Sequence, residues 1–291
     1  MPEQELLGPT SHTFVSQRLK LHYVDWGNRD APPLLLLHGG RDHCRSWDWT
    51  AQALRKDWHV IAMDHRGHGD SAWSPDGGYQ ITTYLYDVAQ LIHQLELKPV
   101  SIVSHSMGSI VSLRYAGLYP ENVRRLATIE GLGFPPDAYS NRWMIPVHQR
   151  LTGWIEDRRA LAGKLHYRYP TLDAALERMR QENTQLSEEQ ARHLTIHAVS
   201  RNEDGTYSWK FDPYLRSGVP TDIALADMHA LWASIACPVL LCWGTESWAL
   251  DPTPELKHFQ NARVAAFQGA GHWVHHDKFD AFLSEIRDFL K

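Results

Sequence analysis

Cysteine is scarce in this chain of 291 residues, which has three, at positions 44, 237 and 242. An odd and scattered set does not form a disulfide framework. Long apolar runs are also missing: the longest aliphatic run is four leucines at 34–37, against the ~20 residues that a membrane-spanning helix needs. The chain begins Met-Pro-Glu-Gln-Glu, without the apolar segment of a signal peptide, so we expect a cytoplasmic protein.

Positive charge is not in excess either. The chain has 29 Lys and Arg against 34 Asp and Glu, a net charge of −5, and a pI near 6.4. Nucleic acids and anionic membranes attract basic surfaces, so we expect neither as a partner. Two residue types are abundant, with 12 Trp and 18 His. This aromatic content argues against disorder, and the histidines raise a metal site as a hypothesis.

Short all-apolar runs alternate with helical patterns along the chain. The expected strands lie at 20–26, 33–37, 59–63, 100–103, 123–129, 238–243 and 263–267. Apolar residues spaced by three and four, or a stretch ending at a proline, predict helices at 46–54, 84–95, 109–119 and 279–289. All-apolar strands that alternate with helices predict the α/β class, with a mostly parallel sheet flanked by helices on both faces.

The alternation stops between Gly131 and Cys237. This stretch is richer in charge, has helical patterns at 172–180 and 187–199, and has no obvious buried strand. We therefore expect a helical insertion, the cap, at 134–235. The core is then formed by 1–133 together with 236–291.

The most specific motif is a tight turn centred on Ser106. The strand at 100–103 leads into Ser-His-Ser-Met-Gly, and a helix follows. Such a turn holds its central residue in strained backbone geometry and exposes its side chain, and its flanking positions must be small. Glycine is usual at the first flanking position, where this chain has Ser104. An ordinary strand–turn–helix with an incidental serine is the structural alternative.

Two further loops follow expected strands. His38-Gly39-Gly40 ends the leucine-rich strand, and glycines there let backbone amides approach a substrate. His272 follows the last strand, between Gly271 and Trp273, which suits a general base. Each loop alone also fits a structural turn. A serine first and a histidine last, both at strand ends, is the chain order of one hydrolase fold.

Taken together with the loop Asp-His-Arg-Gly-His-Gly-Asp-Ser at 64–71, these motifs resemble the α/β-hydrolase superfamily over nearly the whole chain. The insertion matches a helical cap placed after the sixth family strand, as in capped serine-hydrolase-like members. The resemblance implies that Ser106 attacks an acyl carbon while His272 accepts its proton. It also implies an oxyanion hole made by the backbone amides of Gly40 and Met107, and no cofactor.

The acid of the triad has three candidates. The commonest family pattern places an Asp three residues after the glycine that ends the strand before the histidine loop, where this chain has Ser247. Glu246 stands one residue early, and Asp251 four residues late. Another branch places the acid at the end of the strand after the nucleophile helix, where Glu130 stands. We favour Glu130, keep Glu246 as the main alternative, and leave Asp251 or no acid as the remaining one.

The substrate pocket is expected to include Arg41, Trp143, Trp248 and Trp273, which flank the motifs. Several further tryptophans lie close to these loops in the sequence, at positions 47, 49, 73, 154 and 243. This gathering favours a bulky, apolar substrate. The pairs of histidines at 65 and 68 and at 275 and 276 lack zinc-site spacing, so we expect no metal in the catalytic machinery.

The function expected from the resemblance is that of a cofactor-free serine hydrolase. Its substrate would be a carboxylic ester or lactone of a small to medium apolar or aromatic molecule, cleaved through an acyl-enzyme. A hydrolase of carbon–carbon bonds remains an alternative, because that branch also uses serine and histidine. A ligand receptor that retains the hydrolase pocket remains another, since such receptors resemble intact hydrolases.

Overall fold

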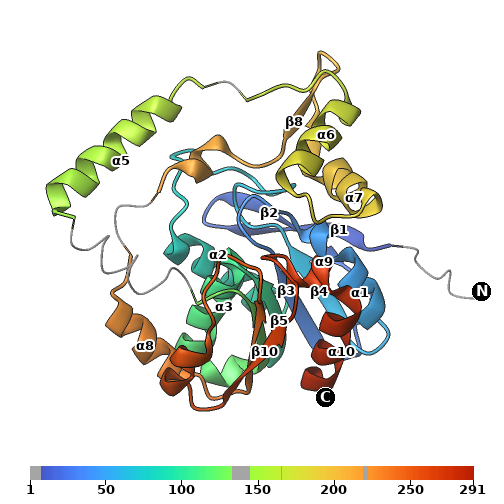
Figure 1. Ribbon diagram of the computed structural model, residues 1–291, viewed down its shortest axis with the longest axis vertical. Coiled ribbons are helices and arrows are strands. Elements are labelled where there is room, and N and C mark those ends of the chain that lie inside the picture. The colour runs from blue at the N-terminus through green and yellow to red at the C-terminus, as the bar shows by residue number, and fades with distance from the viewer. Residues whose placement is uncertain (1–7, 133–144, 165, 219–221) are drawn as a thin grey trace, which may run out of the picture.

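The computed structural model describes residues 8–132, 145–164, 166–218 and 222–291 (Figure 1). Its centre is an eight-stranded sheet with the order β1-β2-β4-β3-β5-β6-β9-β10. The strands are β1 (Thr10–Ser16), β2 (Leu19–Asp25), β3 (Pro33–Leu37), β4 (His59–Met63), β5 (Val100–His105), β6 (Val123–Ile129), β9 (Val239–Gly244) and β10 (Ala262–Phe267). From β4 to β10 the neighbouring strands are parallel, and β1 and β2 add an antiparallel edge.

Helices cover both faces of the sheet. They are α1 (Asp48–Leu54), α2 (Ile81–Gln94), α3 (Met107–Leu118), α8 (Leu225–Ser234), α9 (Val274–Asp277) and α10 (Phe279–Leu290). The run of leucines in β3 serves both faces, because alternate side chains of a strand point to opposite sides. Leu35 and Leu37 pack in one buried layer with α2, α3 and α8, while Leu34 and Leu36 pack in the other with α1 and α10.

The α/β class and the mostly parallel sheet are confirmed, and all seven expected strands are present. The edge strand β1 was not expected. Among its side chains only Phe14 and Ser16 are buried, so it lacks the apolar run that marks an interior strand. Among the described residues, no helix is long and apolar enough to cross a membrane.

The stretch expected to form the cap contains α5 (Val147–Leu161), α6 (Leu172–Glu182) and α7 (Glu188–Ala198). It also contains a short hairpin of β7 (Val199–Arg201) and β8 (Tyr207–Trp209), which was not expected. These strands have three residues each, too short to show a period of two in the sequence. Figure 1 shows α6, α7 and β8 on one side above the sheet and α5 on the other.

Helix α8 falls inside the range expected for the cap but packs on α3 of the core. A Cβ at Gly117 of α3 would lie 2.4 Å from the backbone oxygen of Leu231, so the two helices touch through their backbones. Met228 and Trp232 of α8 are buried in the same apolar layer as α2 and α3. The boundary of the cap at residue 235 remains a prediction.

Candidate active site

Ser106 lies between the last residue of β5 and the first residue of α3, with φ 50° and ψ −115°. Only strong local constraint holds a residue other than glycine in this region. The Ser106 amide donates to the carbonyl of Ile129 in β6 at 2.8 Å. A Cβ at Gly108 would lie 2.6 Å from the oxygen of His38, so glycine is required there. The elbow is therefore fixed by its neighbours on both sides.

Ser104, the departure from the usual glycine, fits the elbow without a clash. Its side chain is buried, and its Oγ lies 2.8 Å from Oγ of Ser112 on α3. The hydroxyl thus bonds across the contact between strand and helix. A serine in this position ties β5 to α3, and the strand and helix still approach closely.

Glu130 is the residue directly after β6, and its backbone also has a positive φ, 51°. Its side chain is fully buried, and its Oε2 lies 2.5 Å from Nδ1 of His272. The same oxygen accepts the Ser247 hydroxyl at 2.6 Å, and Oε1 accepts the Gly244 amide at 3.0 Å. The carboxylate therefore contacts Nδ1 of His272 and leaves Nε2, the other ring nitrogen, free of this contact.

The other two acids lie elsewhere. Glu246 is exposed, and within the described residues no hydrogen bond joins it to His272. Asp251 accepts the amide and hydroxyl of Thr253, at 2.9 and 2.6 Å, and so shapes a turn. Glu246 fails as a partner of His272 because its loop directs it to solvent. Ser247, at the usual acid position, instead donates to the carboxylate that reaches the histidine from β6.

His105, the residue before the nucleophile candidate, supports the histidine loop. Its Nε2 donates to the backbone oxygen of His272 at 3.0 Å, and the two ring centroids lie 4.7 Å apart. Burial holds the pKa of His105 well below its usual value, so this ring is neutral. No role was predicted for His105 from the sequence, although its place inside the elbow motif could have singled it out.

The loop after β3 passes directly over the elbow. A Cβ at Gly39 would lie 3.2 Å from Cβ of Ser106 and 2.8 Å from Nδ1 of His105. Gly40 faces open space, and Arg41 has a positive φ of 61°. The amide of Met107 begins α3 beside Ser106. Both expected oxyanion donors thus belong to segments that flank the serine.

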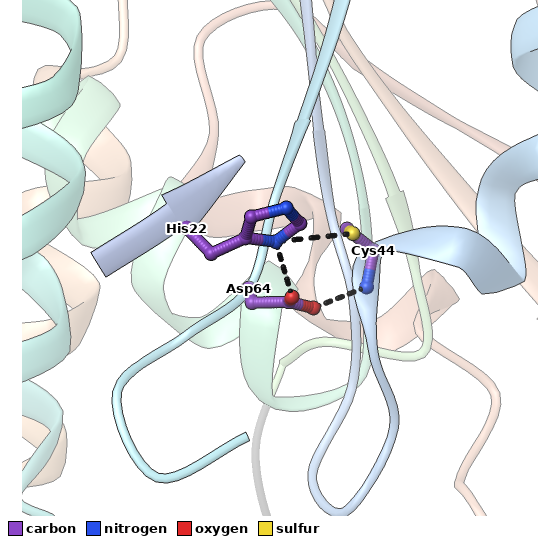
Figure 2. Close-up of side chains that lie close together, drawn as sticks. All are labelled: His22, Cys44 and Asp64. Carbon is purple, nitrogen blue, oxygen red and sulfur yellow. Dashed lines mark hydrogen bonds and ion pairs between the residues drawn. The ribbon is translucent and has the colours of Figure 1, made fainter. Parts of the chain in front are cut away.

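Asp64 holds the start of the short 3-10 helix that follows this loop, and Figure 2 shows its contacts with His22 and Cys44. Its Oδ1 accepts the Cys44 amide at 2.7 Å, and its Oδ2 accepts His22 Nδ1 at 2.7 Å and the Asp70 amide at 2.9 Å. Burial alone would raise the pKa of Asp64, but the hydrogen bond and charge of His22 lower it. These bonds join the oxyanion loop to β2 and to the 64–71 loop, which fits a structural role for that loop.

The largest cavity near the site, about 1020 Å³, lies between the oxyanion loop and the cap. Gly40, Arg41 and Trp273 line it from the core. Aromatic side chains line it from the cap, namely Tyr167, Tyr169, Trp209 and Phe211. The cavity also has charged residues on its wall, Lys164, Glu177, Arg178, Glu182 and Arg216. Its lining is therefore both aromatic and charged.

The other expected pocket residues have different surroundings. Trp248 is 62% exposed and lies against His272, with ring centroids 4.8 Å apart. Trp143 lies outside the described residues. Trp47 is fully buried in the core, so the expectation that it gathers at the pocket is wrong. A second cavity, of about 190 Å³, is lined by Glu130 and Trp243 among others.

The histidines of the 64–71 loop are buried aromatic residues. Burial lowers the pKa of His65 to about 3 and that of His68 to about 4, so both are neutral at pH 7. His275, near the other end of the chain, is also buried, and burial lowers its pKa well below the usual value. Packing in the core accounts for these rings, which explains part of the abundance of histidine.

The chain is similar to known hydrolases. The family model for the alpha/beta hydrolase fold matches residues 32–279. A serine hydrolase-like protein of Danio rerio is 32% identical over 64% of this chain and 57% of its own length, so that relative extends well beyond the shared region. The esterase Rv0045c of Mycobacterium tuberculosis is 25% identical over 97% of this chain and 90% of its own.

Among solved structures, a thioesterase domain from the curacin biosynthetic pathway superposes with a TM-score of 0.82. It covers 96% of this chain and 99% of that domain at 22% identity, a likeness that concerns the fold. The family match, the sheet order and the strained serine at the end of β5 agree. The chain belongs to the α/β-hydrolase fold family of hydrolases.

Proposed function

We propose that this chain is a serine hydrolase that cleaves carboxylic esters or lactones through an acyl-enzyme on Ser106. The observation that supports it most strongly is the contact of 2.5 Å between Glu130 and His272. Ser106, with its strained backbone, follows β5, and Glu130 follows β6, the neighbouring strand of the sheet. A nucleophile, a base and an orienting acid are the three parts that such a reaction requires.

In the proposed mechanism, Nε2 of His272 takes the proton from Oγ of Ser106 as the oxygen attacks the acyl carbon. Glu130 fixes the proton on Nδ1 and stabilises the imidazolium that forms. The amides of Gly40 and Met107 receive the oxyanion, each worth about 3–4 kcal/mol in the barrier. His272 then protonates the leaving alcohol, and water activated by the same ring releases the acid.

The pocket supports a substrate of moderate size with an apolar or aromatic body. Tyr167, Trp209 and Phe211 of the cap face the same cavity as Gly40 of the oxyanion loop. The aromatic lining residues would retain apolar groups, while the charged ones suit a polar substituent. The name of the mycobacterial relative, an esterase, agrees with this class.

The test is a panel of p-nitrophenyl esters of rising chain length, together with aromatic esters and lactones, on wild type and Ser106→Ala. We expect sustained turnover that Ser106→Ala abolishes. Activity that survives this substitution would refute the mechanism. Slow acylation that stops after one turnover would favour the ligand receptor. Cleavage of a vinylogous diketone but of no ester would favour the hydrolase of carbon–carbon bonds.

A further inference from the structure

Two imidazoles and one carboxylate converge where α8 meets the short 3-10 helix η4 (Thr253–His258). The rings of His229 on α8 and His258 on η4 are stacked, with centroids 3.6 Å apart and 12° between their planes. Nε2 of His229 lies 3.4 Å from Oε2 of Glu255, and Nε2 of His258 lies 3.7 Å from the same oxygen. Two ring nitrogens therefore surround one carboxylate oxygen.

These separations are too long for ordinary hydrogen bonds and suit a shared ion. N–H···O bonds in proteins span roughly 2.7–3.2 Å. The buried Nε2 of His229 has no hydrogen-bond partner within the part of the chain that the structure describes. Zinc binds nitrogen and oxygen ligands at about 2.0–2.1 Å in a tetrahedron, which sets its ligand atoms about 3.3 Å apart. The observed 3.4 and 3.7 Å are close to this edge length.

We propose that His229, Glu255 and His258 bind a divalent transition-metal ion, with Zn²⁺ as the best match. Two imidazoles and one carboxylate are ligands that zinc accepts, and a water molecule would take the fourth position. The side chains are 21–25% exposed, but Nε2 of His229 is itself buried, so its ring must turn outward for an ion to reach it. All three ligand atoms lie within 4.8 Å of one another, and a rotation that separates the two stacked rings would point both Nε2 atoms at one ion.

Two other groups of similar composition are already occupied by direct contacts. In the buried group of Figure 2, His22 and Asp64 form a hydrogen bond of 2.7 Å, and backbone amides fill the rest of the carboxylate. In the group around Asp48, the guanidinium of Arg45 binds both carboxylate oxygens, at 2.6–2.9 Å, and His193 bonds it at 3.0 Å. A metal ion would have to displace that cation.

The proposed ion would join two segments on either side of the strand β9. α8 precedes this strand, and η4 follows the loop that carries Ser247 and Trp248. Glu255 also lines the cavity of about 190 Å³ that Glu130 lines. The ion would therefore brace the wall of this cavity without touching Ser106. This inference does not depend on the proposed reaction.

The protein is stripped of metal with a chelator and titrated with ZnCl₂ by calorimetry, and the zinc that stays bound after dialysis is measured. We expect one tightly bound Zn²⁺ per chain and a rise in Tm, because an ion that binds the folded state stabilises it. Glu255→Gln and His258→Gln should each lower the affinity for Zn²⁺ at least ~10-fold. Even the loss of a residue that only hydrogen-bonds to a ligand typically costs this much, and these two residues are proposed as ligands themselves. CoCl₂ should give the strong visible absorption of tetrahedral Co²⁺ in wild type but not in the Glu255→Gln and His258→Gln variants.

The matched control is His193→Gln, which alters the group around Asp48 and should bind Zn²⁺ like wild type. Each variant is first compared with wild type in the metal-free state by Tm and circular dichroism, and the two ligand substitutions check one another. Wild type that binds no Zn²⁺ would overturn the proposal. So would wild-type affinity in both ligand variants, or loss of the ion in the control alone.

Discussion

Replacement of Glu130 by glutamine tests the central contact of the candidate site. The carboxylate accepts three hydrogen bonds, from His272 Nδ1, the Ser247 hydroxyl and the Gly244 amide. An amide has only one acceptor oxygen, so Glu130→Gln cannot keep all three. If this oxygen stays on Gly244, its NH₂ group faces His272, whose Nδ1 must then be the acceptor. The histidine proton moves to Nε2, and the ring can no longer take the proton of Ser106.

The opposite orientation of the amide is costly as well. It would point NH₂ at the buried Gly244 amide and leave that donor unpaired, at a cost of about 1–3 kcal/mol. The tautomer that blocks catalysis is therefore preferred. The equivalent exchange of acid for amide in a serine triad lowers kcat by about 10⁴-fold. At about 1.36 kcal/mol per tenfold, this corresponds to about 5.4 kcal/mol in the barrier.

The assay is the hydrolysis of the best p-nitrophenyl ester found in the panel, measured as kcat and KM. We expect Glu130→Gln to lower kcat by about 10³–10⁴-fold with little change in KM. The control is Glu246→Gln, whose exposed side chain should leave kcat within about twofold of wild type, as is usual for surface substitutions. A Glu130→Gln enzyme with more than a tenth of wild-type kcat, or an inactive control, would refute the reasoning.

Three further predictions concern groups that support the site. Ser247→Ala removes one hydrogen bond to the charged Glu130, worth about 1.5–3 kcal/mol, and should lower kcat by ~10-fold or more in the same assay. Gly108→Ala places a Cβ 2.6 Å from a backbone oxygen and should lower the free energy of unfolding in urea by at least about 1–3 kcal/mol. Asp64→Asn removes the carboxylate that His22 contacts and should lower the free energy of unfolding by about 3–5 kcal/mol. The folded-state pKa of Asp64 is lowered, so its stabilisation is present above the unfolded pKa and is lost as pH falls toward the folded pKa, which acid titration of both proteins will show.

The interior strands were predictable because a strand buried on both faces has an almost continuous run of apolar residues. Leu34 to Leu37 read as one apolar run since α1 and α10 cover one face and α2 and α3 the other. The edge strand β1 and the hairpin of β7 and β8 were missed. One is largely exposed, and the other is too short to show a periodicity. The same reasoning placed Trp47 near the pocket, but proximity along the chain does not tell which way a side chain points.

The sequence by itself determined the elbow around Ser106, because local sterics require small residues at 104 and 108. It also placed His272 in the loop that follows the last strand. It left the acid open between Glu130 and Glu246. Glu130 and Ser247 are 117 positions apart, and only the pairing of β6 with β9 brings them together. The order of parallel strands is set by the packing of the whole sheet, so no local pattern encodes which carboxylate reaches His272. The same holds for the convergence of His229 and His258 on Glu255, which depends on how α8 packs beside η4.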